Sequence, residues 1–294
     1  MSPFARRLQQ SATTGQIGQS WYMPVQYDTF QWILNGTAQQ QSDGSLAAYS
    51  LIDFDFREGE DESQSKTAPD NVTAINARRA KIAHWQSLGK RVIAYIPAGD
   101  WENYRRDYAT LNDNGHLGGI IGGWPDERWV NITGSHLAPV LTAIQARVDE
   151  AVADGFDGIE FDLVEVAEAY EYEGLSETGF AVSHAEQAVF NRAIFQMVHD
   201  AGLFVVMKGY ASHVGDFVDD TDMALMEEPF QDSFRENQCV SGLAPYVSAG
   251  KLVVVVHYAN GTTPNSTLCA TAGSRGWQLI FKNMSLNPPI GVCA

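Results

Sequence analysis

Residues 155–164 read GFDGIEFDLV, and this stretch carries the pattern that decides the fold. Before it, Ala138–Ala153 repeats apolar residues at spacings of three and four, which is typical of an amphipathic helix, and Gly155 ends that helix. From Gly158 to Val164 the chain is mostly apolar, as in a buried strand. A helix that leads directly into a buried strand indicates a protein in which helices and parallel strands alternate.

The same alternation recurs along most of the chain. Seven further apolar, β-rich runs are Phe30–Leu34, Ala48–Phe54, Arg91–Pro97, Leu203–Lys208, Met223–Glu228, Leu252–Tyr258 and Leu279–Asn283. Helical patterns fill most of the gaps, at Asn71–Leu88, Ser183–Ala201 and Val240–Ala249. Eight strands predict an α/β fold of the (β/α)8 or TIM-barrel type, formed as a single domain by residues 21–294 after a polar extension of residues 1–20. No glycine-rich phosphate loop follows the first strand, which argues against a nucleotide-binding sheet.

Charge and composition limit the classes of partner. The 294 residues include 36 acidic and 19 basic ones, for a formal charge of −17. Nucleic acids and anionic membranes both attract positive patches, so we expect neither as a partner, and a neutral or cationic ligand is easier to accept. No stretch approaches the roughly 20 apolar residues that span a bilayer. We also expect a monomer.

Six N-x-S/T sequons exceed the about two that chance would place in such a chain, which indicates a secreted glycoprotein. They are Asn35, Asn71, Asn131, Asn260, Asn265 and Asn283. Asn283 is expected to lie in the last strand and to stay unused. Cys269 and Cys293 flank that strand and could pair, which would leave Cys239 alone, although an odd count determines no framework.

Polar side chains gather at the C-terminal ends of the predicted strands, where barrels of this type carry their active sites. Glu160 and Asp162 lie two residues apart and so share one face of a strand, while Ile159 and Phe161 should face the helices. Charged groups inside apolar strands are costly unless they are paired or functional. The candidate site residues are Asp53, Asp55, Tyr95, Asp100, Trp101, Glu160, Asp162, Lys208, Glu227 and Tyr258.

Carboxylates crowded at one barrel mouth suit glycoside hydrolysis, which needs one protonated carboxylic acid and one carboxylate across the scissile bond. Crowding raises the pKa of one carboxyl group, and this supplies the acid. A single acid at a strand end is more often a helix cap, but a set on four strands favours function. Lys208 is either a counter-ion for Asp162 or Glu160 or a substrate contact.

Aromatic residues near the strand ends could stack on sugar rings. Trp101 and Tyr258 follow their strands and should be exposed at the barrel mouth, whereas Trp32 and Trp129 suit core packing equally well. The long segment Asp100–Ile132 should cover the catalytic face as a loop, and we interpret its glycine-rich part, residues 118–123, as flexible.

No spacing of ligands predicts a metal ion or a cofactor. Histidines show no zinc pattern, nothing resembles a calcium-binding EF-hand loop, and no G-x-S-x-G turn presents a serine nucleophile. We therefore expect the carboxylates to carry the chemistry by themselves.

Several motifs, taken in order, resemble those of the endo-α-1,4-polygalactosaminidases, glycoside hydrolase family 114. They are FQWILNG at 30–36, RVIAY at 91–95, AGDWE at 98–102, GFDGIEFD at 155–162, FNR at 190–192, Glu227 and AGK at 249–251. The resemblance implies a (β/α)8 barrel that cleaves α-1,4-linked galactosamine polymers within the chain. It carries over Asp162 as nucleophile and Glu227 as general acid/base, with retention of configuration. A cationic polysaccharide would suit the charge of −17.

The chain departs from the family pattern around these acids. The family continues the fourth-strand motif with Asn and a later Asp, where this chain has Leu163 and Glu165. The family's N-E-Q-C is Met226–Pro229 here, and Gly209-Tyr210 replaces an Asn-Asp pair. Two alternatives therefore stay open: a glycosidase of the same fold that acts on another α-glycan, and a carbohydrate-binding barrel without activity, against which the retained acids argue.

Overall fold

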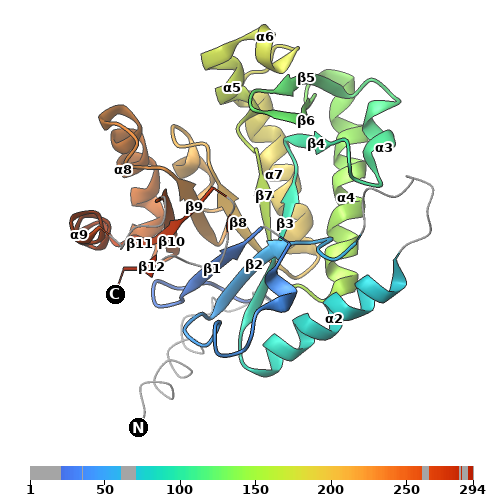
Figure 1. Ribbon diagram of the computed structural model, residues 1–294. Helices are drawn as coiled ribbons and strands as arrows, with labels where there is room; N and C mark the ends of the chain where they lie inside the picture. The colour runs from blue at the N-terminus through green and yellow to red at the C-terminus, as the bar shows by residue number, and fades with distance from the viewer. Residues whose placement is uncertain are drawn as a thin grey trace.

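The computed structural model describes residues 21–34, 36–60, 71–259, 265–284, 286 and 291–293, so the predicted extension of residues 1–20 lies outside the described residues. Eight parallel strands form a curled sheet at its centre, in the order β1-β2-β3-β7-β8-β9-β10-β11 (Figure 1). They are β1 (Phe30–Ile33), β2 (Leu51–Asp55), β3 (Arg91–Pro97), β7 (Gly158–Asp162), β8 (Phe204–Lys208), β9 (Met223–Glu227), β10 (Leu252–Tyr258) and β11 (Gln278–Lys282). All eight predicted strands, and with them the (β/α)8 fold, are confirmed.

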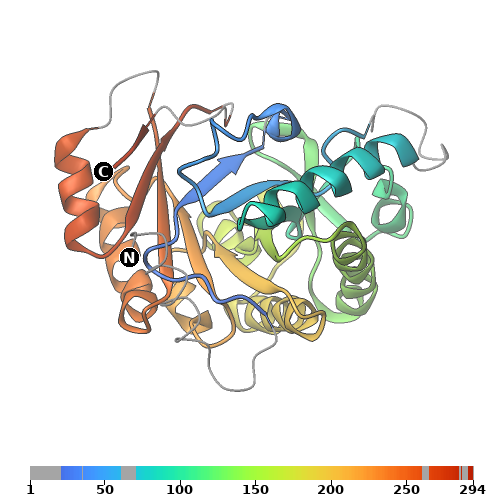
Figure 2. The ribbon, with the colours of Figure 1, turned by 90° about the horizontal axis from the view of Figure 1, so that it is seen from below.

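Helices surround the strands on the outside, as the view from below shows (Figure 2). The long ones are α2 (Val72–Ser87), α4 (Leu137–Asp154), α7 (His184–Asp200), α8 (Ser233–Ser248) and α9 (Ser266–Ser274). In the described residues, only the short 3-10 helices η1 (Ala38–Gln40) and η3 (Val214–Phe217) follow β1 and β8. The predicted start of α8 at Val240 is wrong, because the helix begins seven residues earlier at Ser233, where Asp232 caps it by accepting the Arg235 N–H at 2.8 Å.

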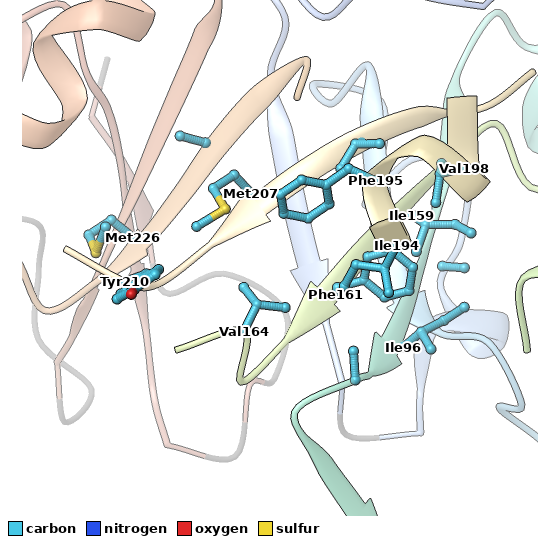
Figure 3. Close-up of a cluster of buried hydrophobic side chains, with 14 of the residues drawn as sticks. Ile96, Ile159, Phe161, Val164, Ile194, Phe195, Val198, Met207, Tyr210 and Met226 are labelled. Carbon is cyan, nitrogen blue, oxygen red and sulfur yellow. The ribbon is translucent and has the colours of Figure 1, made fainter. Parts of the chain in front are cut away.

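Alternating side chains divide the core into two layers. Ile159 and Phe161 of β7 point outward, as predicted, and pack with Ile194 and Val198 of α7 (Figure 3). The residues between them face the barrel interior, because side chains alternate along a strand. The lower interior is apolar, with Phe30, Leu51, Ile93, Phe204, Val206, Met223, Leu225, Leu252, Val254 and Ile280 in one cluster. Toward the C-terminal ends of the strands the inward positions become polar, and this places the site.

Side chains bridge the seam between the first and last parallel strands. The described residues of β1 and β11 share no backbone ladder. Instead, the Gln278 side chain accepts the Phe30 N–H at 2.9 Å and donates to the Asp28 carbonyl at 2.9 Å. Four residues on, the buried Lys282 ammonium donates to Gln31 at 2.7 Å and to the Trp32 carbonyl. Two inward side chains of β11 thus replace the missing ladder.

Gln278→Ala is expected to lower the free energy of unfolding by about 1–3 kcal/mol, because two backbone groups lose their partner. The stability of Gln278→Glu should lie between those of the wild type and Gln278→Ala, since a carboxylate still accepts from Phe30 but cannot donate to Asp28. Urea denaturation of the three proteins measures the order. Equal stabilities would mean that the seam does not depend on this side chain.

The segment after β3 forms a small sheet of its own, where a loop was predicted. It contains β4 (Asp100–Glu102), α3 (Tyr108–Asn112), β5 (Leu117–Ile121) and β6 (Trp124–Val130), paired antiparallel in the order β4-β6-β5. We call residues 100–130 the insert. It lies beside α5 (Val166–Glu173) and α6 (Leu175–Thr178), at the top of Figure 1.

The interpretation of residues 118–123 as a flexible loop is wrong, because its first residues lie in β5. The glycines serve close packing instead of flexibility. A Cβ atom on Gly118 would lie 2.0 Å from the Thr178 carbonyl oxygen, and one on Gly119 would lie 2.0 Å from that of Glu177. Only glycine therefore allows α6 to rest on β5.

The end of the chain is held by the disulfide Cys269–Cys293, with a Cα–Cα distance of 5.3 Å, which confirms the predicted pairing. Cys239 is buried and free. Asn283 lies just after β11, so its predicted place in the strand is wrong by one residue. Asn35 and Asn260 lie outside the described residues. Within the described part of the chain, no helix is long and apolar enough to cross a membrane.

Candidate active site

A cleft of about 700 Å³ opens over the C-terminal ends of the strands, between the barrel and the insert. Six of the ten predicted site residues line it: Asp55, Tyr95, Asp162, Lys208, Glu227 and Tyr258. All six side chains point inward from their strands, on the same face as the apolar residues of the lower interior. The barrel therefore brings together side chains that are up to about two hundred residues apart in the sequence.

Asp162, the last residue of β7, is held by three donors. The Lys208 ammonium lies 2.5 Å from Oδ1, the Leu163 N–H donates to the same oxygen at 2.9 Å, and the Tyr95 hydroxyl donates to Oδ2 at 2.6 Å. Burial raises the pKa of the Asp162 carboxyl, but the Lys208 charge and the three hydrogen bonds outweigh it and hold the pKa below its ordinary value. Asp162 is therefore an ionised carboxylate at neutral pH.

Glu227, the last residue of β9, faces Asp162 across Lys208. The Lys208 ammonium lies 3.0 Å from Glu227 Oε2, and the Tyr258 hydroxyl donates to Oε1. The two carboxylate oxygens that share the ammonium are therefore separated by no more than the sum of their two contacts, about 5.5 Å. Glu227 is the more exposed of the two, at 31% of its side chain against 16% for Asp162.

The Lys208 side chain acts as the shared counter-ion of the site. It is only 4% exposed, and its ammonium lies 4.9 Å from the centre of the buried Trp32 ring. Burial lowers the pKa of Lys208, but the surrounding carboxylates raise it well above its ordinary value, so the lysine stays charged. Of the two roles that the sequence left open, the geometry supports the counter-ion.

Two predicted residues, Asp53 and Glu160, lie beneath the cleft and do not line it. Both are fully buried and lie next to each other, so that a proton on one carboxyl group can be donated to the other. Burial and the neighbouring carboxylate raise the pKa of Asp53 well above its ordinary value, and burial raises that of Glu160 to about 7. The pair therefore holds a proton at neutral pH, 3.8 Å below the Lys208 ammonium at its nearest oxygen.

Asp100 and Trp101 lie in β4 of the insert and do not line the cleft either. The prediction that Trp101 is exposed is wrong, because its side chain is fully buried. The Arg147 guanidinium of α4 stacks on its ring at 3.6 Å, and the indole N–H donates to the Tyr108 carbonyl at 3.2 Å. Asp100 is 2% exposed, and burial together with Glu102 raises its pKa well above the ordinary value. Both residues belong to the base of the insert.

The insert and α5 supply cleft residues that strand ends alone could not reveal. Arg105 pairs with Asp55, at 2.5 Å from Oδ2, and Glu127 faces the cleft from β6. Burial and the Glu102 and Asp162 charges raise the pKa of Glu127 to about 7. Trp124 is 55% exposed at the rim. Their position depends on how the insert folds, and no short sequence signal carries that information.

Glu165 lies in the cleft wall just after β7. Its Oε2 atom is buried and, among the described residues, has no hydrogen-bond partner. Burial, together with the Asp162 and Glu168 charges, raises its pKa to about 8, against the opposing Lys208 and Arg235 charges. The residue is thus mostly protonated at neutral pH, although it lines the cleft.

Left-handed backbone turns follow three neighbouring strands at the site. Leu163 after Asp162 has φ +54°, Glu228 after Glu227 has φ +47°, and Tyr210 after the Lys208-Gly209 pair has φ +55°. Such conformations cost of order 1–3 kcal/mol in residues other than glycine and cluster at functional sites. The turn at Leu163 brings its carbonyl against Gly99, where an added Cβ atom would lie 1.6 Å away.

A comparison with known families agrees with this geometry. The model of glycoside-hydrolase family GH114 matches residues 10–294. The chain belongs to this family. As a GH114 protein it is a glycoside hydrolase.

Solved structures share the GH114 fold at low identity. Ega3 of Aspergillus fumigatus, in a crystal structure with galactosamine, superposes with a TM-score of 0.73 at 23% identity, over 95% of this chain and 100% of that one. The glycoside hydrolase domain of PelA from Pseudomonas aeruginosa gives 0.59 at 10% identity, over 88% and 96%. No curated protein matches the sequence. At these identities the two structures support the fold alone.

Proposed function

We propose that this GH114 protein cleaves α-1,4-linked galactosamine-containing polysaccharide within the chain, with retention of configuration. The observation that carries the proposal is the pair of carboxylates Asp162 and Glu227 on one ammonium. Retaining glycosidases place their carboxyl groups about 5–5.5 Å apart, and inverting ones about 6.5–9.5 Å. The two oxygens nearest Lys208 lie within about 5.5 Å of each other, a close approach that is compatible with the retaining arrangement.

We assign the two roles from the three donors that hold Asp162 and from the greater exposure of Glu227 to the cleft. Asp162, ionised and held by three donors, attacks the anomeric carbon while Glu227 gives its proton to the departing glycosidic oxygen. The bond from the anomeric carbon to that oxygen breaks, and a bond to Asp162 forms. A water molecule then gives a proton to Glu227 and its oxygen to the anomeric carbon, which frees Asp162 and returns both groups to their first states.

The charge of the cleft supports a cationic substrate. Eight acidic and only two basic side chains line it. Glu127 and Glu165 hold protons near neutral pH, and both lie near Asp162. A sugar ammonium in the cleft would add a positive charge beside these two carboxyl groups and favour their ionised forms. That the structural neighbour Ega3 was crystallised with galactosamine is consistent with this substrate.

Product release from partly deacetylated α-1,4-galactosaminogalactan tests the proposal. We expect oligosaccharides from this polymer and little or none from the same polymer after complete N-acetylation, because acetylation removes the cation. Chromatography of the released oligosaccharides, labelled at their reducing ends, measures cleavage of each polymer. Equal cleavage of the two polymers would contradict recognition of the sugar ammonium. No cleavage of either polymer would contradict the proposed substrate class. We also propose that the protein is secreted, on the basis of the sequons, and that it acts as a monomer.

Glu165→Gln should stabilise the protein at pH 8 and weaken its activity. A carboxyl group whose pKa is raised in the folded state binds protons more tightly there, so stability falls as pH rises from about 4.5 to about 8. Glutamine removes this loss. We expect a melting temperature at least about 2–4 °C higher than wild type at pH 8, since each 1 kcal/mol produces a shift of about that size, and an unchanged one at pH 4.5. The value of kcat/KM on the deacetylated polymer should fall about tenfold. A variant that is no more stable at pH 8 would contradict the ionisation argument.

A further inference from the structure

Glu228 directly follows the proposed acid/base Glu227, yet its side chain takes a different direction. The left-handed turn at Glu228, with φ +47°, interrupts the alternation of β9. Glu227 lines the cleft, whereas Glu228 does not, and its carboxylate reaches the end of the neighbouring strand β10. No step of the proposed reaction uses Glu228.

The Glu228 carboxylate continues the ladder between β9 and β10 by one residue. The backbone pairing ends with the Glu228 N–H, which donates to the Val256 carbonyl at 2.8 Å. The next N–H of β10 on this side, that of Tyr258, then donates to Glu228 Oε1. The second oxygen, Oε2, lies 3.0 Å from Nδ1 of His257. A side chain thus takes the place of a backbone carbonyl as the acceptor for Tyr258.

Tyr258, whose backbone Glu228 holds, also contacts the proposed acid/base Glu227. Tyr258 is held on its other side by β11, where it pairs with Lys282 in the parallel register, and the following Ala259 N–H donates to the Lys282 carbonyl at 2.7 Å. With its backbone held from both sides, Tyr258 places its hydroxyl on Oε1 of Glu227. The contacts form a closed ring from the Glu227 backbone through Glu228 and Tyr258 to the Glu227 carboxylate.

The geometry points to Glu228 as a positioning residue for the proposed reaction: by holding Tyr258, it sets the orientation of the reacting carboxyl group. Glu228 touches no reacting atom, so its effect passes through the phenol. Burial and the neighbouring carboxylate raise the pKa of the Tyr258 phenol far above its ordinary value, so the hydroxyl remains a hydrogen-bond donor. The inference rests on the proposed role of Glu227.

Kinetics of four variants test the inference. Tyr258→Phe should lower kcat/KM about 10- to 100-fold, the range for a lost hydrogen bond to a charged group. It should also move the basic limb of the pH–rate profile to higher pH, because a carboxyl group that loses a donor keeps its proton longer. Glu228→Met, of similar length but without an acceptor, should reproduce both effects. The double variant should be no slower than Tyr258→Phe alone, since one pathway is removed twice.

Glu228→Gln keeps an oxygen that can accept from Tyr258 and should restore both the rate and the profile. Glu171→Met is the matched control, because it removes another glutamate–histidine contact of 3.0 Å, with His184, away from the cleft lining. It should leave the pH profile unchanged. Glu228→Met that lowers the melting temperature without moving the basic limb, or a double variant with additive losses, would overturn the inference and leave only a structural role.

A second measurement does not depend on the substrate. The fluorine resonance of 3-fluorotyrosine at position 258 reports the contact of the phenol. It should shift in Glu227→Gln and Glu228→Met, but not in Glu228→Gln or Glu171→Met. No shift in Glu228→Met would overturn the inference even if no polymer is cleaved. The proposed function is tested by polymer cleavage in the wild type, and the role of Glu228 by the fluorine resonance. Failure of one proposal can therefore be told from failure of the other. If Glu228→Met does not fold, Glu228→Asn, whose shorter side chain cannot span the same gap, takes its place with the same expectations.

Discussion

Glu227→Gln is expected to lower kcat on the deacetylated polymer by about a hundredfold to ten-thousandfold, the range that a positioned general acid contributes. Glutamine keeps the size of the side chain and an oxygen for the Tyr258 hydroxyl. It cannot give a proton to the departing oxygen. KM should change little, because the substrate contacts remain, and the melting temperature should stay close to that of the wild type.

The roles of the two acids separate on an aryl galactosaminide. A phenolate leaves without a proton, so Glu227→Gln should still release a burst of phenol as the covalent intermediate accumulates. Asp162→Asn has no nucleophile and should show neither burst nor turnover. The control is Asp149→Asn, an exposed residue of α4 bonded to Gln145, which should behave as the wild type. The opposite pattern would exchange the roles, and activity in both variants would refute the assignment.

The alternation of inward and outward residues could be predicted because it depends only on neighbours in the sequence. Glu160 and Asp162 share a face of β7 whatever else the chain does, and the same spacing places Lys208 and Glu227 inside the barrel. What the pattern does not contain is depth. Glu160 is fully buried, whereas Asp162, two residues further along the same strand, borders the cleft. Their difference depends on where β7 ends within the barrel.

The insert could not be predicted, because its form depends on contacts between distant segments. Trp101 follows β3 closely and so resembles a residue at the barrel mouth. It is buried because Arg147, 46 positions later in the chain, covers its ring. Gly118 and Gly119 resemble a flexible loop, but they are required by α6, which arrives almost sixty residues later. The seam at Gln278 is likewise a contact across nearly the whole chain.

Arg147→Met is expected to lower the free energy of unfolding by about 3–5 kcal/mol, the cost of removing one partner from a buried ionic group. Arg147 is fully buried on α4. Its guanidinium binds both oxygens of Asp107, at 2.8 and 3.1 Å, and donates to the Pro97 carbonyl at the end of β3 at 2.9 Å. It also stacks on Trp101. Methionine fills part of the space and satisfies none of these polar groups.

Arg91→Met is the matched control, because Arg91 pairs with Asp157 at a similar distance of 3.0 Å but is 44% exposed. An exposed pair contributes about 0–1 kcal/mol, so this variant should unfold nearly as the wild type does in urea. Equal losses of unfolding free energy in the two variants would show that burial does not increase the contribution of Arg147 to stability. A larger loss in Arg147→Met should come with weaker cleavage as well, because the segment that Arg147 anchors to the barrel also carries Arg105 and Glu127 into the cleft. The activity of this GH114 protein then depends on a cation that lies outside the cleft and touches no reacting atom.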